Sequence, residues 1–256
     1  MVIKLSKRLQ QIADYVPNGC RMADIGSDHA LLPAYLAKSK LITYAVAGEV
    51  NRGPYEAAQR QVQTYALEQV VDVRMGDGLA VLQAGEVDCI TIAGMGGSLM
   101  VSILDADSSK LTGVKKLILQ PNVGEDLVRI WLRSHGWLLL QETILEEDGK
   151  IYEILVAERR EARELEAADE EMYAPRQLKC GLVLDTKRLL EMGPYLTRQP
   201  SDVFIQKWQG EVRKQERVIQ TMAKAEAGEV EVKRREFEQQ KLALEEIIEC
   251  LQKELQ

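Results

Sequence analysis

Residues 19–30 of the chain read Gly-Cys-Arg-Met-Ala-Asp-Ile-Gly-Ser-Asp-His-Ala. An apolar run ends at Ile25, a turn follows at Gly26, and a stretch with helical spacing begins near residue 29. A strand that passes through a glycine turn into a helix is the unit with which open parallel sheets bind nucleotide-like ligands. This stretch therefore predicts an α/β fold with a ligand site at the turn.

The same alternation of elements continues to about residue 158. Short β-branched or aliphatic runs predict strands, and the amphipathic stretches between them predict helices, as in a doubly wound, mostly parallel sheet. Residues 146–150, which contain Asp-Gly, separate the last two runs and predict an antiparallel hairpin. The expected fold class is therefore α/β with seven strands. We expect strands at 19–25, 42–49, 70–75, 87–93, 115–119, 137–145 and 151–157, and helices at 29–38, 53–67, 97–104 and 124–135 after a leading helix.

The chain changes character after the predicted sheet, where strand signals end and an acidic segment follows. We divide it into a domain of residues 1–160 and a helical domain of residues 161–256. In the second domain, apolar residues recur at helical spacing over 204–222 and 237–255, with a break at 225–228. This pattern predicts an antiparallel coiled-coil hairpin. Pairing within one chain and pairing between chains both remain open, so we expect a monomer or a weak homodimer.

Composition excludes several classes of protein. The 256 residues are 46% hydrophobic and 29% charged, which is typical of a folded chain and not of a disordered one. No apolar run reaches the roughly 18 residues that span a bilayer. The four cysteines lie far apart without a CxxC pattern, so we expect neither a metal site nor a disulfide framework. These features predict a cytoplasmic protein without a membrane segment.

Charge is distributed unevenly along the chain. The formal net charge is −7, which argues against overall basicity as a means of binding nucleic acid. Residues 172–224, however, contain ten basic and five acidic residues. That segment is either a footprint for a polyanion or a solvated helical surface, and the pattern alone leaves both interpretations open.

Acidic residues around the first turn indicate which ligand it takes. Asp28 stands where a dinucleotide fingerprint has its second glycine, and Asp24 lies nearby. A carboxylate there repels a pyrophosphate, whereas S-adenosylmethionine has no phosphate and carries a sulfonium and an ammonium. The turn therefore favours S-adenosylmethionine over a nicotinamide dinucleotide. The alternative is that Asp28 only caps the following helix.

Two further strand ends carry carboxylates. Glu49 lies 23 residues after Gly26, near the spacing at which an acid accepts hydrogen bonds from ribose hydroxyls. Asp77 follows the third strand. It is suited to accept a hydrogen bond from the adenine amino group, or else it caps a helix that begins at Leu79.

The fourth and fifth strand ends carry glycines and amides. Three glycines between Ala93 and Ser98 allow the backbone to pass close to a ligand, or they reflect tight packing alone. Gln120 and Asn122 place two amides beside the expected methyl donor, and amides read base edges because each offers a donor and an acceptor. His29 lies in the first turn, where it either lines the cofactor pocket or is structural.

Together these motifs resemble the bacterial tRNA methyltransferases that form N1-methyladenosine at position 22. The likeness spans residues 3–158, and a looser one reaches the C-terminal helical hairpin through Gly-Pro-Tyr-Leu at 193–196. The strings that carry it are Ala-Asp-Ile-Gly-Ser-Asp-His-Ala at 23–30, Gly-Glu at 48–49, Gly-Asp-Gly at 76–78, Ile-Ala-Gly-Met-Gly-Gly at 92–97 and Leu-Gln-Pro-Asn at 119–122.

The resemblance implies a class I methyltransferase that uses S-adenosylmethionine on tRNA. The chain departs from the wider class because it lacks a second glycine in the first turn and lacks the Asn/Asp-Pro-Pro-aromatic string of many amino methyltransferases, which makes methylation of an exocyclic amine less favoured. Mapped onto this chain, the implied cofactor site has Gly26, Ser27, Asp28 and His29 at the methionine part with Asp24 close by, Glu49 at the ribose, Asp77 and Gly78 at the adenine, and Ala93, Gly94 and Met95 beneath the methyl group.

The target atom determines the expected mechanism. N1 of adenine has an in-plane lone pair and needs no deprotonation, so we expect positioning together with stabilisation of the ring cation. We assign the electrostatic role to Asp28, and orientation of the base to Gln120 and Asn122. Because N1 lies on the Watson–Crick edge, a paired adenine must first leave its helix.

Affinity for tRNA is expected to come mainly from its phosphates, because a single base offers little area to bind. We expect the helical hairpin to grip the RNA outside the reactive arm. The candidate cations are Lys4, Lys7, Arg8, Arg176, Lys179, Lys187 and Arg188. Competing interpretations are a methyltransferase for a small molecule or another RNA, a nicotinamide-dependent oxidoreductase, and a non-enzymatic protein in which the coiled coil is the working part.

Overall fold

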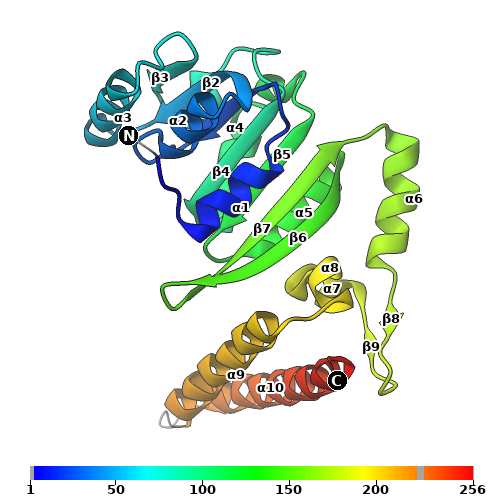
Figure 1. Cartoon of the computed structure of the whole chain (residues 1–256). Helices are drawn as coiled ribbons and strands as arrows, with labels where there is room; N and C mark the ends of the chain where they lie inside the picture. The colour runs from blue at the N-terminus through cyan, green and yellow to red at the C-terminus, as the bar shows by residue number, and fades with distance from the viewer. Residues whose placement is uncertain (1–2, 224–227, 256) are drawn as a thin grey trace. The chain divides into compact units, whose positions relative to one another are not determined.

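The structure of the chain, a computed structural model, describes residues 3–223 and 228–255. Seven of its strands form one sheet: β1 (Cys20–Ile25), β2 (Ile42–Glu49), β3 (Val71–Met75), β4 (Cys89–Met95), β5 (Lys116–Pro121), β6 (Trp137–Glu147) and β7 (Lys150–Arg159). Their order is β3-β2-β1-β4-β5-β7-β6, so the strand order reverses beside β1 (Figure 1). The first five strands are parallel, whereas β7 runs antiparallel to β5 and pairs with β6. The predicted seven-stranded, mostly parallel sheet and its hairpin are confirmed.

Helices cover both faces of this sheet. They are α1 (Lys7–Tyr15), α2 (Leu31–Lys38), α3 (Arg52–Thr64), α4 (Gly97–Ala106) and α5 (Glu125–Ser134), with two short 3-10 helices, η1 (Gly78–Val81) and η2 (Ser108–Leu111). In Figure 1, α1 crosses in front of the sheet and α5 lies behind it. Ile12, Leu36 and Val62, one from each of the first three helices, share a buried cluster with Met22 and Ile118 of the sheet.

Cover on both faces explains why the strands read as continuous apolar runs. Leu117, Ile118 and Leu119 of β5 are each exposed by 1% or less. Ile118 belongs to the cluster beneath α1, α2 and α3, and because side chains alternate along a strand, its two neighbours face the opposite side. Parallel strands that are buried on both faces lose the alternation of apolar and polar residues.

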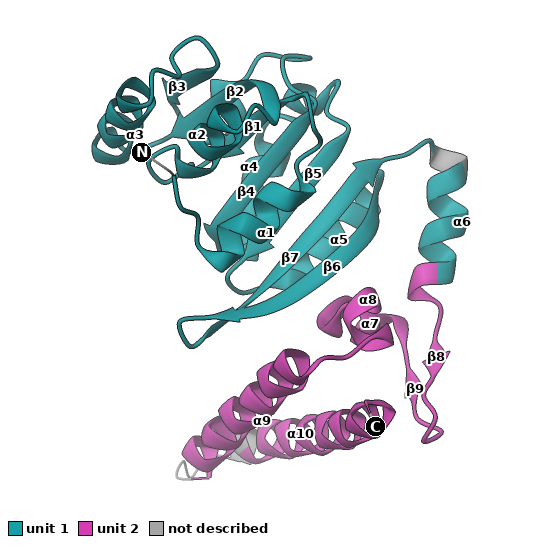
Figure 2. Cartoon of the chain, viewed as in Figure 1, with its two compact units in different colours: residues 1–171 teal, residues 172–256 magenta. Residues whose placement is uncertain are grey.

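The chain divides into two compact units, residues 1–171 and 172–256 (Figure 2). We expected the division after residue 160. The acidic segment belongs with the sheet instead, because it forms most of α6 (Ala162–Tyr173), whose Asp169 pairs with Arg133 of α5. No helix within the described ranges is long and apolar enough to cross a membrane.

The second unit combines a small hairpin with helices. Its described elements are β8 (Arg176–Gln177), β9 (Val183–Leu184), α7 (Thr186–Met192), α8 (Pro194–Arg198), α9 (Asp202–Met222) and α10 (Gly228–Glu254). The two long helices pack side by side (Figure 1). The break expected at 225–228 falls, except for its last residue, outside the described residues, and coiled-coil geometry stays a prediction. The β8–β9 hairpin was not expected, because strands of two residues leave no periodic pattern.

A disulfide joins Cys180 to Cys250, so the expectation that the cysteines form no disulfide was wrong. The two residues are 70 positions apart in the sequence, but the β8–β9 hairpin brings their Cα atoms to 5.9 Å, within the range that a disulfide requires. The backbone N–H of Lys179 also donates to Glu254 at 2.9 Å. The tip of the hairpin is therefore fastened to the end of α10. Cys20 and Cys89 are free and buried.

A buried ionic group anchors the β6–β7 hairpin to α5. Arg129 of α5 donates to Glu142 of β6 at 2.6 Å and also pairs with Glu153 of β7. All three side chains are exposed by 1% or less. Charges at this depth are tolerated only when every member is paired, because desolvation is otherwise uncompensated. The group holds in place a hairpin that also carries Glu147 and Tyr152, two residues that contact α1.

Replacing the buried guanidinium should strongly destabilise the fold. Arg129→Met should lower the free energy of unfolding by about 3–5 kcal/mol, because two buried carboxylates lose their cation. Urea denaturation measures this change. Arg133→Met is the matched control on the same helix, since its partly exposed ion pair with Asp169 should contribute about 0–1 kcal/mol. Equal losses for the two variants would contradict the anchoring role.

Candidate active site

A cavity of about 300 Å³ opens at the carboxyl ends of β1, β4 and β5, beside the reversal of strand order. Open α/β sheets bind their ligands at this position. Most of the residues around the cavity were expected from the sequence, and Arg8, Leu9 and Tyr152 join them. The lining consists of Arg8, Leu9, Asp24, Gly26, Ser27, Asp28, Ala93, Gly94, Asn122 and Tyr152.

The first turn requires glycine at position 26. Gly26 has a φ of +69°, and a Cβ there would lie 2.2 Å from the methyl carbon of Met95. The backbone N–H groups of Gly26 and Ser27 both donate to the carbonyl of Gly48, at 2.9 and 3.2 Å. The turn is thus tied to the end of β2 on one side and packed against the end of β4 on the other.

Asp24 lies at the base of the cavity and is 5% exposed. Its carboxylate accepts hydrogen bonds from Ser27 Oγ, at 2.6 Å, and from Thr91 Oγ1 of β4. Burial raises the pKa of Asp24, while these two hydroxyls and the charge of Arg8 act in the opposite direction. A further positive charge at the site would therefore stabilise the ionised carboxylate of Asp24.

Residues 28–30 continue the turn in the left-handed region, with φ values of +45°, +67° and +55°. The side chain of Asp28 is 85% exposed and lies 3.4 Å from Nε2 of His29. Ala30, not Asp28, precedes the first residue of α2, and no side chain caps that helix. The alternative role of Asp28 as a helix cap is therefore not observed. His29 stands beside the cavity and is not among the residues that line it.

Glu49 ends β2 and is 6% exposed. Burial raises its pKa, and the backbone N–H groups of His29 and Asp28, which bond to the carboxylate, oppose that shift. Its Oε1 atom is buried and has no hydrogen-bond partner in the described structure. A buried acceptor without a donor is rare in native structures and fits a ligand that brings a hydroxyl to this place.

Asp77 follows β3 and precedes η1, with its side chain exposed. It makes no capping hydrogen bond to that short helix, so the alternative role of a helix cap is not observed. Gly78 follows with a φ of +50°. Asp77 and Gly78 stand at the end of the strand that pairs with β2, whose last residue is Glu49.

The glycines after β4 differ in what they do. Gly94 has a φ of +79° and lines the cavity. A Cβ on Gly97 would lie 2.0 Å from the carbonyl oxygen of Gly124, so tight packing explains that glycine. The two interpretations of the glycine string thus apply to different positions.

The amides after β5 form a network with Arg8. Gln120 is fully buried, and its Oε1 accepts hydrogen bonds from Arg8 Nη1 at 2.6 Å and from the backbone N–H of Gly94 at 3.1 Å. Its Nε2 donates to the carbonyl of Pro121 and to Oδ1 of Asn122. Asn122 in turn donates to the carbonyl of Gly94 at 2.7 Å and is exposed. The structure places Gln120 beneath the site and Asn122 at it.

Arg8, which was expected to contact RNA, lines the cavity. Its guanidinium stands 5.3 Å from the ring centre of Tyr152 in β7, and Glu147 accepts a hydrogen bond from its backbone N–H at 3.4 Å. The one sequence signal for this placement is that Arg8 stands next to the apolar residue Leu9. A side chain in that position borders the buried face of the helix. The position of Tyr152 depends on the β6–β7 pairing and had no signal of its own.

The other candidate cations divide into exposed and engaged residues. Lys4 and Lys7 are exposed near the start of α1. In the second unit, Lys179 is exposed, and Lys187 is exposed although its ammonium lies 3.9 Å from Glu191. Arg176, by contrast, donates to the carbonyl of Thr197 at 2.7 Å. Arg188 pairs with Glu191 at 2.8 Å.

Comparisons with known proteins agree with this geometry. The tRNA (adenine(22)-N(1))-methyltransferase family matches residues 22–249. The chain is 45% identical over 223 residues to the tRNA (adenine(22)-N(1))-methyltransferase of Bacillus subtilis, which covers 87% of each protein.

Solved structures give the same result. The crystal structure of the B. subtilis m1A22 tRNA methyltransferase matches with a TM-score of 0.82 and 41% identity, over 96% of this chain and 99% of that one. A Streptococcus pneumoniae protein described as a putative tRNA (m1A22) methyltransferase, solved in complex with S-adenosyl-L-methionine, matches with a TM-score of 0.78 and 37% identity, over 96% of this chain and 100% of that one. The chain belongs to the tRNA (adenine(22)-N(1))-methyltransferase family.

Proposed function

We propose that the cavity at the ends of β1, β4 and β5 is where this chain transfers the methyl group of S-adenosylmethionine to N1 of adenine 22 in tRNA. The activity and the cofactor are those of its family. The observation that supports this placement is the pair of buried carboxylates at neighbouring strand ends, Asp24 and Glu49, one of which keeps an unpartnered acceptor. When bound, S-adenosylmethionine supplies an electrophilic methyl group on a sulfonium.

The residues present fit the parts of that cofactor. Glu49 Oε1 is suited to the ribose hydroxyls, and Asp77 with Gly78 is suited to the adenine amino group. The backbone of Gly26 and Ser27 borders the methionine part, with His29 beside it. Ala93, Gly94 and Met95 form the floor beneath the methyl group.

Arg8 provides the complement to the acidic groups. It is the one basic residue among those that line the cavity, which also contains Asp24 and Asp28. The amino-acid end of S-adenosylmethionine is a zwitterion, so its ammonium is suited to Asp24 and its carboxylate to Arg8. Gln120 and Tyr152 hold the guanidinium from two sides. Arg8 therefore serves the cofactor in this proposal and is withdrawn as a phosphate contact.

The chain needs to position the base but not to deprotonate it. Asn122 is exposed at the cavity, and its amide is held by Gln120 and Gly94, so it presents fixed polar atoms to a base edge. Gln120 orients Asn122 and does not reach the base itself. The exposed carboxylate of Asp28 is placed to stabilise the positive charge that develops on the adenine ring.

The rest of the tRNA binds to exposed cations. Lys4 and Lys7 lie in the first unit, and Lys179 and Lys187 lie in the second, which includes the helices α9 and α10 that we propose as the outer grip on the RNA. Arg176 and Arg188 serve internal contacts instead. We further propose that the chain acts in the cytoplasm as a monomer or a weak homodimer.

The activity has a direct test. Pure protein, labelled S-adenosylmethionine and unmodified tRNA transcripts should give labelled N1-methyladenosine in nucleoside analysis. The same transcript with guanine at position 22 should give none. Label that persists in this control would move the target to another nucleotide. An absence of label, despite demonstrated cofactor binding, would move the substrate away from tRNA.

Arg8 should recognise the carboxylate of the cofactor. Arg8→Met should weaken binding of S-adenosylmethionine by about tenfold or more, because a charge-assisted hydrogen bond is lost. Binding of decarboxylated S-adenosylmethionine should change much less, so calorimetry on both ligands isolates the effect. Lys7→Met removes a neighbouring exposed charge and should affect neither ligand. A parallel loss for both ligands in Arg8→Met would refute the carboxylate assignment.

The charge of Asp24 should favour binding of the cofactor and lower the stability of the ligand-free protein. The pKa of Asp24 is higher in the folded chain than its ordinary value of 3.8. Its contribution to the free energy of unfolding is therefore complete below about pH 3.8 and is lost as the pH rises through the native pKa. Asp24→Asn should therefore raise the melting temperature of the ligand-free protein at pH 7, with a smaller gain near pH 4, while weakening S-adenosylmethionine binding. Asp88, whose pKa Arg21 lowers, gives the opposite sign, so Asp88→Asn should reduce stability at pH 7. A lower melting temperature for Asp24→Asn would contradict this reading.

A further inference from the structure

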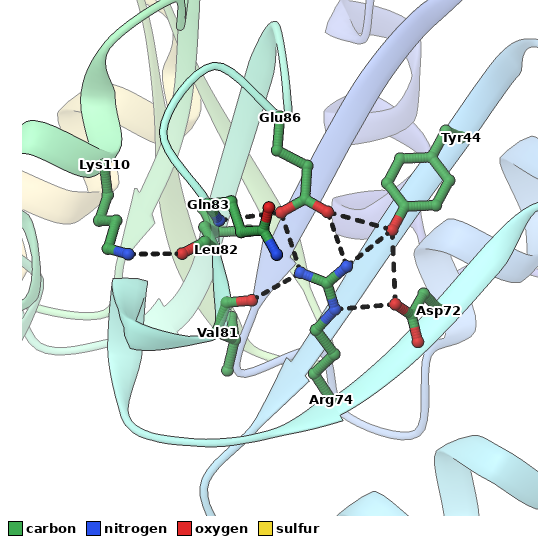
Figure 3. A network of polar contacts seen from close by, with 8 residues as sticks. All are labelled: Tyr44, Asp72, Arg74, Val81, Leu82, Gln83, Glu86 and Lys110. Carbon is green, nitrogen blue, oxygen red and sulfur yellow. Dashed lines mark hydrogen bonds and ion pairs between the residues drawn. The ribbon is translucent and has the colours of Figure 1, made fainter.

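A polar network surrounds the guanidinium of Arg74, near the end of β3 (Figure 3). Arg74 donates two hydrogen bonds to the carboxylate of Glu86, at 2.6 and 2.9 Å. It also donates to Asp72 at 2.8 Å and to the hydroxyl of Tyr44 in β2 at 2.9 Å. A fourth partner is the backbone carbonyl of Val81, at 2.8 Å. One side chain thus joins two strands to the segment that follows β3.

That segment is residues 76–88, which contain the turn Asp77-Gly78 and return the chain to β4. Glu86 accepts a further hydrogen bond from the backbone N–H of Gln83 at 2.9 Å. Lys110 donates to the carbonyl of Leu82 at 2.8 Å (Figure 3). The start of the segment packs against α4, where a Cβ on Gly78 would lie 3.1 Å from a side-chain carbon of Ile103. The polar contacts fix its backbone from Val81 to Glu86.

The side chain of Val81 packs against the ends of β2 and β3. A Cβ on Gly48 or on Gly76 would lie 2.9 Å from a methyl carbon of Val81, so the valine side chain fills the space that both glycines leave. Gly48 immediately precedes Glu49, and Gly76 immediately precedes Asp77. Val81 therefore packs against both strand ends that carry the two carboxylates, beside the hydrogen bond from the backbone N–H of Gly76 to the carbonyl of Glu49 at 2.9 Å. Arg74 holds Val81 by its carbonyl.

Arginine is the residue that can make this connection. A guanidinium offers five N–H donors in a planar fork, which allows it to serve a carboxylate in two places and still reach other oxygens. Arg74 lowers the pKa of Glu86, so the pair stays ionised at neutral pH. The side chains of Arg74 and Glu86 are 25% and 17% exposed. A lysine in place of Arg74 would lack the donors for this set of oxygens.

We infer that Arg74 and Glu86 are positioning residues for adenine recognition, because they hold the Asp77-Gly78 turn where Asp77 accepts a hydrogen bond from the 6-amino group. The inference rests on the placement of adenine in the proposed function. Neither residue touches the cofactor in this scheme; both act through the backbone of residues 76–86.

The test measures recognition of a single group on the ligand. Two probes are used: S-adenosylhomocysteine, and its analogue with hydrogen in place of the adenine 6-amino group. The wild type should bind the first more tightly by about tenfold or more, because a hydrogen bond to a charged group is at stake. Asp77→Ala should bring the ratio of the two dissociation constants close to one, and Arg74→Met and Glu86→Gln should each reduce it severalfold.

Kinetics separate positioning from general damage to the fold. With tRNA as substrate, Arg74→Met and Glu86→Gln should raise KM for S-adenosylmethionine and leave kcat near the wild-type value. Arg133→Met is the matched control, because Arg133 forms an ion pair of similar exposure with Asp169, which joins α5 to α6 and not to residues 76–88. It should keep both the ratio and KM. Glu86→Gln retains the guanidinium with its other partners and decides the matter if Arg74→Met does not fold.

The outcomes distinguish two failures. An unchanged ratio in Asp77→Ala overturns the placement of adenine itself. A ratio that collapses in Asp77→Ala but stays at the wild-type value in both Arg74→Met and Glu86→Gln overturns the positioning role and leaves the proposed function intact. A fall in the ratio for Arg133→Met equal to that for Arg74→Met also overturns it, since the effect would then reflect loss of stability alone.

Discussion

The buried carboxylate of Asp24 is the constraint on which the rest of the site depends. It stands where the strand order reverses, so no connecting helix closes the end of the sheet above it. Two hydroxyls, from Ser27 and Thr91, and the charge of Arg8 keep it tolerable in a place where burial raises its pKa. Such a group is incompletely compensated until a cation arrives. The buried charge therefore lowers the stability of the ligand-free protein, and a cationic ligand removes this destabilisation.

Backbone strain near Asp24 also lowers the stability of the ligand-free protein. Three successive residues after the turn, 28–30, are left-handed without being glycine, a conformation that L-residues adopt only when their surroundings hold them there. Their N–H groups at positions 28 and 29 bond to Glu49, and the turn itself bonds to the carbonyl of Gly48. The end of β2 therefore both stabilises the strained turn and carries the acid suited to the ribose. Loss of the Glu49 carboxylate should therefore disturb the turn, and loss of the turn should displace Glu49.

Local patterns predicted the parts of the molecule that local forces determine. The strands were recognisable because burial on both faces makes them apolar runs, and Glu49 and Asp77 followed from their positions at strand ends. The contacts of Arg8, Gln120 and Cys180 left no sequence signal of this kind because their partners come from distant segments. Arg8 contacts Tyr152 of β7, Gln120 bonds to Arg8 and Gly94, and Cys180 is joined to Cys250 of α10. The network around Arg74 joins three separate segments and left no sequence pattern.

The internal use of arginine clarifies how an acidic protein handles a polyanion. Arg8, Arg74, Arg129, Arg176 and Arg188 each bond to oxygens of the protein itself. A planar fork of donors suits such fixed sets of acceptors, whereas a lysine ammonium is a mobile point charge on a flexible stem. The exposed lysines are thus the cations best suited to phosphates whose positions the protein does not fix in advance. In the arrangement that we propose, Arg8 and Arg74 shape the cofactor site and the affinity for tRNA rests on exposed lysines, so the net charge of the chain says little about either.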